Sequence, residues 1–418
     1  MNTKSLKSSL MKFMPFWLFL TFFKFGGGLH YTVLAPIGEK LFPIWLVGLM
    51  VGISAFAQLL LDIPAGYLLD KYGYKKLLTI TTFLFIIASA CFLLGFSKFA
   101  FLLSLIISTF GWLFFGPGIN AYVINQSPKE SIGRFISARD VFASIGIVFS
   151  SALIPFVVML DMKIVGAILL AIFSVAFIFI LFAPKEKEIK HHEPAHPARN
   201  KDRMKKNFLV EAYRAVMRLR PASIMLLSVG LSASTFYGII WFVVPLLIAH
   251  QVNNGVLGLG LGVFDFSVVI LGFILGKVVD SFDKKILILI GLGLFSIAGI
   301  FIGFNFGFLF LLLGFLATSG DELSGLSLWA WLYKIDKKHE SYGLISGTIS
   351  LFEDLGWTIG PILAGVLYGV VGPTWTIAIG GLIIFLNLII FLLLVKNPIP
   401  EEFHLPPPLK PHRRRYKH

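Results

Sequence analysis

The chain has 418 residues, of which 57% are hydrophobic and only 14% are charged. Soluble domains carry about 25% charged residues, so this composition, with a mean hydropathy of +0.85, excludes a water-soluble globule. The single cysteine, Cys91, excludes a disulfide framework and a cysteine-based redox or metal pair. A membrane-spanning helix needs about 20 apolar residues, so there is room for about a dozen.

Apolar stretches bounded by charged residues, Pro, Gly or Asn divide the chain into two sets of six expected spans. The first set lies near residues 13–36, 43–69, 77–96, 99–124, 136–159 and 163–183. The second set lies near residues 221–249, 253–279, 286–304, 306–332, 341–371 and 373–395. The first span follows MNTKSLKSSLMKF without a small-residue cleavage site, so we expect it to be uncleaved. The prediction is an all-α integral membrane protein with twelve transmembrane helices.

The basic residues predict the orientation of these spans. Lys and Arg number 36 against 22 Asp and Glu, a net charge of +14. Of the 36, 30 fall in the N-terminal tail, the loops after even-numbered spans, the central segment and the C-terminal tail, and only Lys40, Lys98 and Lys163 fall in the other loops. Positive residues stay on the cytoplasmic side, so we expect both termini in the cytoplasm of a plasma or inner-membrane protein, and no nucleic acid partner.

Two polar segments divide the chain into domains. We predict an N-terminal six-helix bundle over residues 1–183 and a C-terminal one over residues 221–395. Residues 184–220 are predicted to be a cytoplasmic linker that ends in a short amphipathic helix on the inner leaflet. Residues 396–418 form a basic cytoplasmic tail, attracted to anionic lipid. His191, His192 and His196 in the linker do not make a complete metal site, and we expect no metal and no cofactor.

A shift of 210 residues aligns the second span with the eighth. Gly48, Leu49, Gly52, Phe56, Leu61, Gly66, Asp70 and Lys75 then coincide with Gly258, Leu259, Gly262, Phe266, Leu271, Gly276, Asp280 and Lys285. Gly48 and Gly52, like Gly258 and Gly262, are four residues apart and allow helix backbones to approach closely. Two pseudo-symmetric bundles from a duplicated half are therefore expected.

The segment Gly66-Tyr-Leu-Leu-Asp70-Lys71-Tyr-Gly73-Tyr-Lys75-Lys76 resembles the signature of the major facilitator superfamily between its second and third spans. Every specified position of G-x-x-x-D-(R/K)-x-G-x-(R/K)-(R/K) is filled. The second copy, Gly276-Lys-Val-Val-Asp280-Ser-Phe-Asp283-Lys284-Lys285, is one residue shorter and lacks the middle glycine. The resemblance implies a transporter fold and a gating role for these motif residues. Asp62 precedes Gly66 and Asp70 by four and eight residues and so lies on the same side of the helix, and we group it with the gate.

Charged residues within the spans are the candidates for transport chemistry, because each is costly in a bilayer without a partner or water. The set comprises Lys24, His30, Asp265, Asp321, Glu322, Glu353 and Asp354. One of the acids carries a coupling proton or meets a cationic substrate, or else the set forms fixed salt bridges between helices. Lys24 and His30 are about 120° apart on a helix and are expected not to face one point. Only one member of each adjacent acidic pair is expected to face a cavity.

Four aromatic residues are predicted to line a central cavity: Tyr31, Trp112, Tyr237 and Trp241. Tyr31 shares a helix face with Lys24, and the resemblance implies that the fourth and seventh spans, which carry the other three, border the cavity. Proton-coupled drug exporters of the family often have an Arg where this chain has Trp112, and their G-x-x-x-G-P-x-x-x-G run lies in the fifth span. Here that run is in the eleventh, at Gly356 to Gly365.

The sequence favours a secondary active transporter, not an enzyme, that works by alternating access. The first hypothesis is an antiporter that exports amphipathic or cationic small molecules in exchange for protons. The second is a proton-coupled importer of a small metabolite, because Lys24 is able to recognise an anion. The third, from another class, is a lipid scramblase, sensor or scaffold with a transporter fold. Expected partners are a small-molecule substrate, protons and the lipids of an anionic inner leaflet, and we expect a monomer.

Overall fold

The computed structural model describes residues 11–127, 132–186, 221–250, 254–335 and 342–395. The first half contains α2 (Met14–Glu39), α3 (Ile44–Tyr72), α4 (Tyr74–Phe92), α5 (Lys98–Gln126), α6 (Ile132–Val157) and α7 (Met162–Phe182). The second half contains α9 (Pro221–Ala249), α10 (Asn254–Ser281), α11 (Lys284–Ile302), α12 (Leu309–Ile335) and α13 (Tyr342–Leu394). The predicted linker helix and the basic tail lie outside the described residues.

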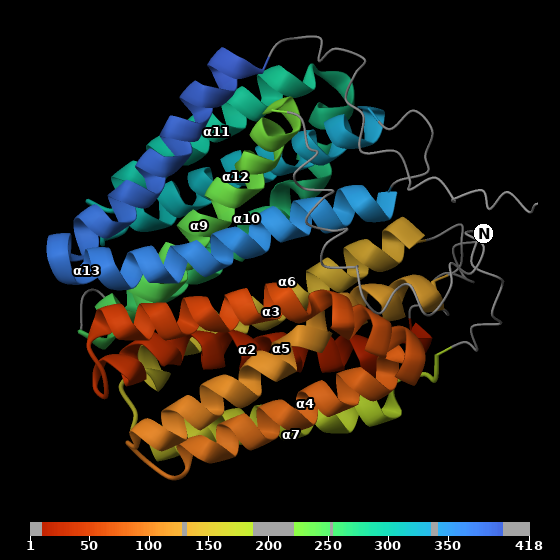
Figure 1. Ribbon diagram of the computed structural model, residues 1–418, viewed down its shortest axis with the longest axis vertical. Coiled ribbons are helices and arrows are strands. Elements are labelled where there is room, and N and C mark those ends of the chain that lie inside the picture. Colours follow the sequence, from red (N-terminus) through yellow and green to blue (C-terminus); the bar gives the residue numbers. More distant parts are fainter. Residues whose placement is uncertain (1–10, 128–131, 187–220, 251–253, 336–341, 396–418) are drawn as a thin grey trace, which may run out of the picture.

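The helices form two bundles, as predicted. Figure 1 shows α2 to α7, in red to yellow, packed beside α9 to α13, in green to blue. The element α13 bends at Gly372, whose φ of 77° favours glycine, and its two arms are the last two predicted spans. All twelve predicted spans therefore overlap helices. In the described residues, nine helical stretches are long and apolar enough to cross a membrane, and one of them, Leu351–Leu394, covers both arms of α13.

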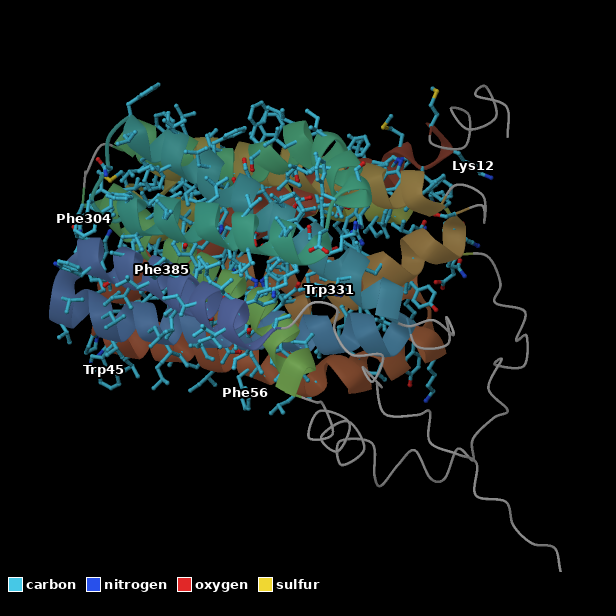
Figure 2. The ribbon with its side chains drawn as sticks, turned by 90° about the horizontal axis from the view of Figure 1, so that it is seen from above. Lys12, Trp45, Phe56, Phe304, Trp331 and Phe385 are labelled. Atoms are coloured by element: carbon cyan, nitrogen blue, oxygen red, sulfur yellow. The ribbon has the colours of Figure 1, made fainter. Side chains whose placement is uncertain are left out.

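The outward faces of the bundles are apolar. Exposed side chains on α4 recur every three or four residues, at Ile80, Phe83 and Ile87. The same helical spacing runs along α7, α11 and the second arm of α13, and Figure 2 shows Trp45 and Phe56 of α3 at the periphery. A continuous apolar surface suits lipid rather than water, which agrees with the integral membrane class.

Helix α2 is the centre of the first bundle, and its three successive glycines explain why. A Cβ on Gly26 would lie 2.9 Å from the ring of Phe173 in α7, and one on Gly27 would lie 2.9 Å from Trp112 in α5. On Gly28 it would lie 2.5 Å from the Ser150 hydroxyl in α6. The glycines therefore let three helices approach α2, which stays helical throughout.

The two bundles touch at one end, here termed the opposite end, where α2 and α9 finish and α3 and α10 begin. The other end, where α3 and α10 finish, is termed the basic end because Lys71, Lys75, Lys76, Lys284 and Lys285 lie there. At the opposite end, a Cβ on Gly48 of α3 would collide with the Pro361 carbonyl and lie 2.9 Å from Gly365 Cα in α13.

The second close approach between the bundles joins α10 to α6. A Cβ on Gly258 would collide with the ring of Pro155 and lie 3.3 Å from the Ser151 carbonyl. Gly258 is the repeat counterpart of Gly48, so the same glycine serves the same interface in both halves. The small-residue pairs noted in the sequence are contacts between bundles.

Candidate functional site

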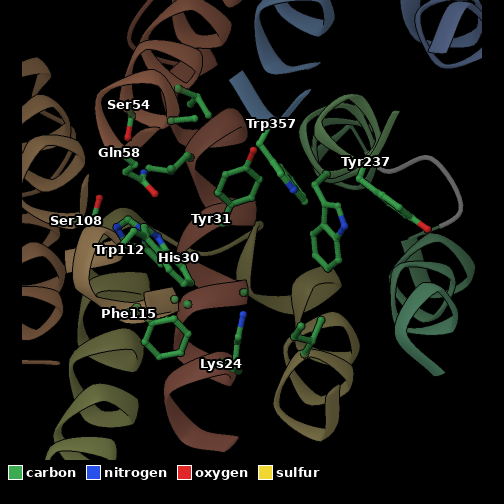
Figure 3. A pocket seen from close by; sticks show the side chains of 18 of the residues that line it. Lys24, His30, Tyr31, Ser54, Gln58, Ser108, Trp112, Phe115, Tyr237 and Trp357 are labelled. Atoms are coloured by element: carbon green, nitrogen blue, oxygen red, sulfur yellow. The ribbon is translucent and has the colours of Figure 1, made fainter. Parts of the chain in front are cut away.

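A cavity of about 620 Å³ lies between the bundles and is bordered by eight helices. Figure 3 shows it from close by. Its predicted lining residues are Lys24, His30, Tyr31, Trp112, Tyr237, Trp241, Asp321 and Asp354. Residues that the sequence did not single out also line it, among them Ser54, Gln58, Ser108, Phe115, Phe264 and Trp357. Drug-sized ligands occupy pockets of about 300–1,000 Å³, so the space suits one small molecule.

Lys24 on α2 reaches the cavity between two aromatic rings of α5. Its Nζ lies 5.7 Å from the centre of the Trp112 ring and 5.2 Å from that of Phe115. Figure 3 shows the ammonium pointing toward the interior of the cavity. Ring faces attract a cation and partly replace the water that a bilayer excludes, so these two rings contribute to stabilising the charge.

His30 lies six residues further along α2 and is fully buried. Its ring stacks on Phe92 at 5.7 Å, and its Nε2 lies 3.3 Å from the Ser104 hydroxyl. Lys24 and His30 both border the cavity, which is large enough to be reached from two directions around α2. The cavity spans a wide arc of α2, since the glycines between the two residues occupy little space.

A neutral polar patch on the first bundle was missed from the sequence. Ser54 and Gln58 are four residues apart on α3 and line the cavity with Ser108 of α5. The Ser54 hydroxyl lies 2.6 Å from that of Thr109. Two polar residues at a spacing of four in an apolar span share one helix face, and this was the available signal.

The acidic candidates for transport chemistry all belong to the second bundle, and the two adjacent pairs are split. Asp321 of α12 and Asp354 of α13 line the cavity, whereas Glu322 and Glu353 are not part of its lining. Tyr237 of α9 donates a 2.9 Å hydrogen bond to the Asp321 carboxylate. Glu353 packs against α9 outside the cavity lining, and a Cβ on Gly230 of α9 would lie 3.2 Å from the Cγ of Glu353.

An aromatic pair joins the bundles above Lys24. Tyr31 of α2 and Trp357 of α13 have ring centres 6.0 Å apart and meet edge to face, as Figure 3 shows. Trp357 follows Glu353 by one helical turn. Tyr237 and Trp241, also one turn apart, supply further aromatic surface from α9.

A polar contact connects the bundles where α2 and α9 finish. His250 Nε2 lies 3.1 Å from the Glu39 carboxylate, and His250 Nδ1 lies 3.2 Å from the Tyr368 hydroxyl. Both side chains of the ion pair are partly exposed. The pair joins the last turn of α2 to the residue after α9, so it holds the opposite ends of the two bundles together.

The signature motif forms a one-residue junction between α3 and α4. Gly73 has φ 94°, and a Cβ there would collide with the Glu186 carboxylate. That carboxylate accepts a 2.6 Å hydrogen bond from the Tyr74 amide at the start of α4. Lys75 donates to the Leu181 and Ala183 carbonyls, at 2.9 and 2.5 Å. The motif thus ties α3 and α4 to the end of α7.

The other motif residues are placed as follows. The ammonium groups of Lys71 and Lys76 lie 4.8 and 5.7 Å from the centre of the Tyr72 ring. In the second copy, Lys284 donates to the Val279 and Phe282 carbonyls at the end of α10. Lys285 is partly exposed at the start of α11. The surroundings of Asp62, Gly66, Asp70, Asp265, Gly276 and Asp280 lie outside what the structure describes, although their backbone belongs to α3 and α10.

The degraded second copy caps its own helix. Asp283, which stands near the missing glycine, accepts a 3.1 Å hydrogen bond from the Ile286 amide at the start of α11. A side chain at this N-cap position satisfies a free amide of the first turn. The first copy has Gly73 there and obtains its acceptor from Glu186 instead.

Comparison with known proteins agrees with this architecture. A mutant of the nucleoside transporter NupG shares 14% identity with the chain, with a TM-score of 0.70, over 91% of this chain and 99% of that one. A POT family transporter in complex with a thioalcohol-conjugated peptide shares 13% identity, with a TM-score of 0.66, over 90% and 95% of the two chains. No curated protein sequence is significantly similar to the chain.

The sequence profile of the Major Facilitator Superfamily matches residues 9–237 and again residues 226–415. Each match covers about one predicted half, so together they account for almost the whole chain. The structural neighbours share the fold at low identity and are transporters. The chain belongs to the Major Facilitator Superfamily and is a multi-pass membrane transporter.

Proposed function

We propose that the protein is a proton-coupled exporter of small amphipathic molecules that carry a basic group. The observation that carries this proposal is the cavity between the bundles, in which the carboxylates of Asp321 and Asp354 accompany seven Phe, Tyr and Trp side chains. Carboxylates attract the basic group and the rings take the apolar part. The basic end faces the cytoplasm, in keeping with the distribution of Lys and Arg.

The acidic groups support proton coupling. Asp321, Glu322, Glu353 and Asp354 all lie within the membrane in one bundle, where a charge is expensive. Binding a proton or a substrate cation relieves that cost, and the two occupants compete for the same carboxylates. Such competition is what exchange of a proton for a substrate requires. We assign the coupling proton to this set.

Alternating access requires the contacts at the opposite end to open. We propose that the signature motif biases this change, with Asp70 as its central acid and Asp62 and Asp280 as further members. Asp70→Asn should lower turnover and leave substrate affinity unchanged, as measured by transport rate against substrate concentration. A defect in affinity alone would contradict the gating role.

The coupling residues are tested by comparing two modes of transport in proteoliposomes. Asp321→Asn, Glu322→Gln, Glu353→Gln and Asp354→Asn are assayed separately with naphthylalanine methyl ester, an aromatic amine. Loss of uptake driven by a pH gradient, with exchange of labelled for unlabelled ester retained, identifies the coupling acid. Asp161→Asn is the matched control, because Asp161 caps α7 at the opposite end and Asn is an equally good cap.

Full retention of gradient-driven uptake in all four variants would favour fixed salt bridges over a coupling acid. The second candidate, proton-coupled import of a small metabolite, is favoured by Lys24, which is able to bind an anionic group. Movement of labelled lipid without any movement of protons would favour the third hypothesis, a scramblase.

We further propose a monomer in the plasma or inner membrane, with both termini in the cytoplasm and anionic lipid at the basic end.

A further inference from the structure

The charges of the cavity are divided between its two walls. The ammonium of Lys24 comes from α2 in the first bundle, and the carboxylates of Asp321 and Asp354 come from α12 and α13 in the second. All three residues border one space of about 620 Å³. A ligand in that space therefore meets opposite charges on opposite sides.

This division disfavours ligands that carry a single charge relative to ligands that carry both charges. A simple cation that approaches Asp321 or Asp354 shares the cavity with the Lys24 ammonium, which repels it. A simple anion that approaches Lys24 shares the cavity with two carboxylates. Repulsion between like charges in a site of low dielectric contributes to specificity as much as attraction does. A molecule with both charges avoids both penalties.

The lining between the charged groups is aromatic. The rings of Trp112 and Phe115 flank Lys24. Above it, Tyr31 and Trp357 meet edge to face. On the other wall, Tyr237 donates a hydrogen bond to Asp321. Ring surfaces on both walls favour a flat apolar body by stacking and edge-to-face contacts. The space between the charged groups is thus suited to an aromatic ring system.

We infer that the preferred substrate is amphoteric: an aromatic small molecule whose anionic group meets Lys24 and whose basic group meets Asp321 and Asp354. This inference rests on the proposed function and narrows its substrate class. It follows from the placement of Lys24 and the two acids on opposed walls with aromatic rings between them. The two bundles then each hold one end of the substrate, so binding links their movements.

Four probes with one ring system separate the contributions of the two charges. Naphthylalanine carries both charges, and its methyl ester carries only the positive charge. Naphthylpropionic acid carries only the negative charge, and N-acetylnaphthylalanine amide is neutral. Isothermal titration calorimetry on the purified full chain measures each Kd at neutral pH without a proton gradient. We expect naphthylalanine to bind about tenfold or more tightly than either singly charged probe, because each charged hydrogen bond contributes on that order.

Variants assign each preference to a wall. Lys24→Gln should raise the Kd of naphthylalanine about tenfold, to that of the ester, and should change the Kd of the ester by no more than about twofold. Asp321→Asn or Asp354→Asn should raise the Kd of naphthylalanine to that of naphthylpropionic acid. Lys24→Arg should keep the ranking. Lys163→Gln is the matched control, since Lys163 is exposed and outside the cavity lining.

Equal binding of the neutral amide and naphthylalanine would overturn the inference, and so would an absence of binding by all four probes to the wild-type chain. An unchanged ranking in folded Lys24→Gln protein would also overturn it. The wild-type ranking tests the inference even where a variant fails to fold. If the ranking holds and no protons move during transport, the proposed coupling fails and the inference stands. If protons move during transport but only singly charged cations are bound and transported, the proposed coupling stands and the inference about amphoteric substrates fails.

Discussion

The Glu39 carboxylate lies 3.1 Å from Nε2 of His250, and this ion pair connects the first bundle to the second at the opposite end. Tyr368 holds the other ring nitrogen of His250 at 3.2 Å. Below this contact, Gly48 packs on the Pro361 carbonyl, and further in Tyr31 meets Trp357. Three successive contacts therefore close the cavity toward the opposite end, and all three must separate if substrate is to leave on that side.

Glu39→Gln should open the opposite end more often. A partly exposed polar pair of this kind contributes about 0.2–1 kcal/mol, so a cysteine introduced at Ala55 in the cavity should react about 1.4-fold to fivefold faster with an impermeant maleimide applied to cells. The neighbouring variant Lys40→Gln serves as the control. Equal labelling rates in Glu39→Gln and wild type would show that this contact does not limit opening.

Lys75→Met should destabilise the first bundle, whereas Lys76→Met should not. Lys75 donates hydrogen bonds to two carbonyls at the end of α7. Lys76 is exposed, and its ammonium lies near the Tyr72 ring. Loss of a hydrogen bond from a charged group costs about 1.5–3 kcal/mol, which should lower the Tm by several degrees. Thermal unfolding of both variants in detergent measures the difference, and identical Tm values would show that Lys75 has no capping role.

Gly48→Ala should disrupt the contact between α3 and α13. The added methyl group would collide with the Pro361 carbonyl, and overpacking of this kind costs about 1–3 kcal/mol. Gly255→Ala is the control, since a Cβ at Gly255 meets nothing within 4 Å. We expect a lower Tm for the first variant only. A Gly48→Ala protein as stable as Gly255→Ala would mean that the helices part without cost.

The sequence predicted the fold because its signals are local or repeated. Each span can be recognised from the length of its own apolar stretch, and the match of Gly48 with Gly258 indicates the duplicated half. Lys24 and Asp321 were candidates because a charge within a membrane helix is rare. The sequence also places Lys24 in the first half and Asp321 in the second, whereas their position on one shared cavity came from the structure.

Other features of the site depend on contacts between distant residues. Trp357 is one of 8 tryptophans, and nothing in its local sequence marks it as the partner of Tyr31. The pairing of Glu39 with His250 arises only when the ends of α2 and α9 meet. Periodicity also could not tell which member of Asp321–Glu322 faces the cavity, because adjacent residues differ by about 100° and both directions are compatible with a bundle.

The movement of protons during transport tests the central claim most directly. Naphthylalanine methyl ester is added outside proteoliposomes that have equal pH on both sides, and the lumenal pH is recorded with a trapped dye. Protein-free liposomes correct for passive entry of the uncharged amine. The account predicts that the lumen becomes more alkaline as protons leave in exchange for the ester, and that this change is lost in at least one of the variants Asp321→Asn, Glu322→Gln, Glu353→Gln and Asp354→Asn. An acidified lumen would indicate import with protons, and ester entry without any change in lumenal pH would contradict proton coupling.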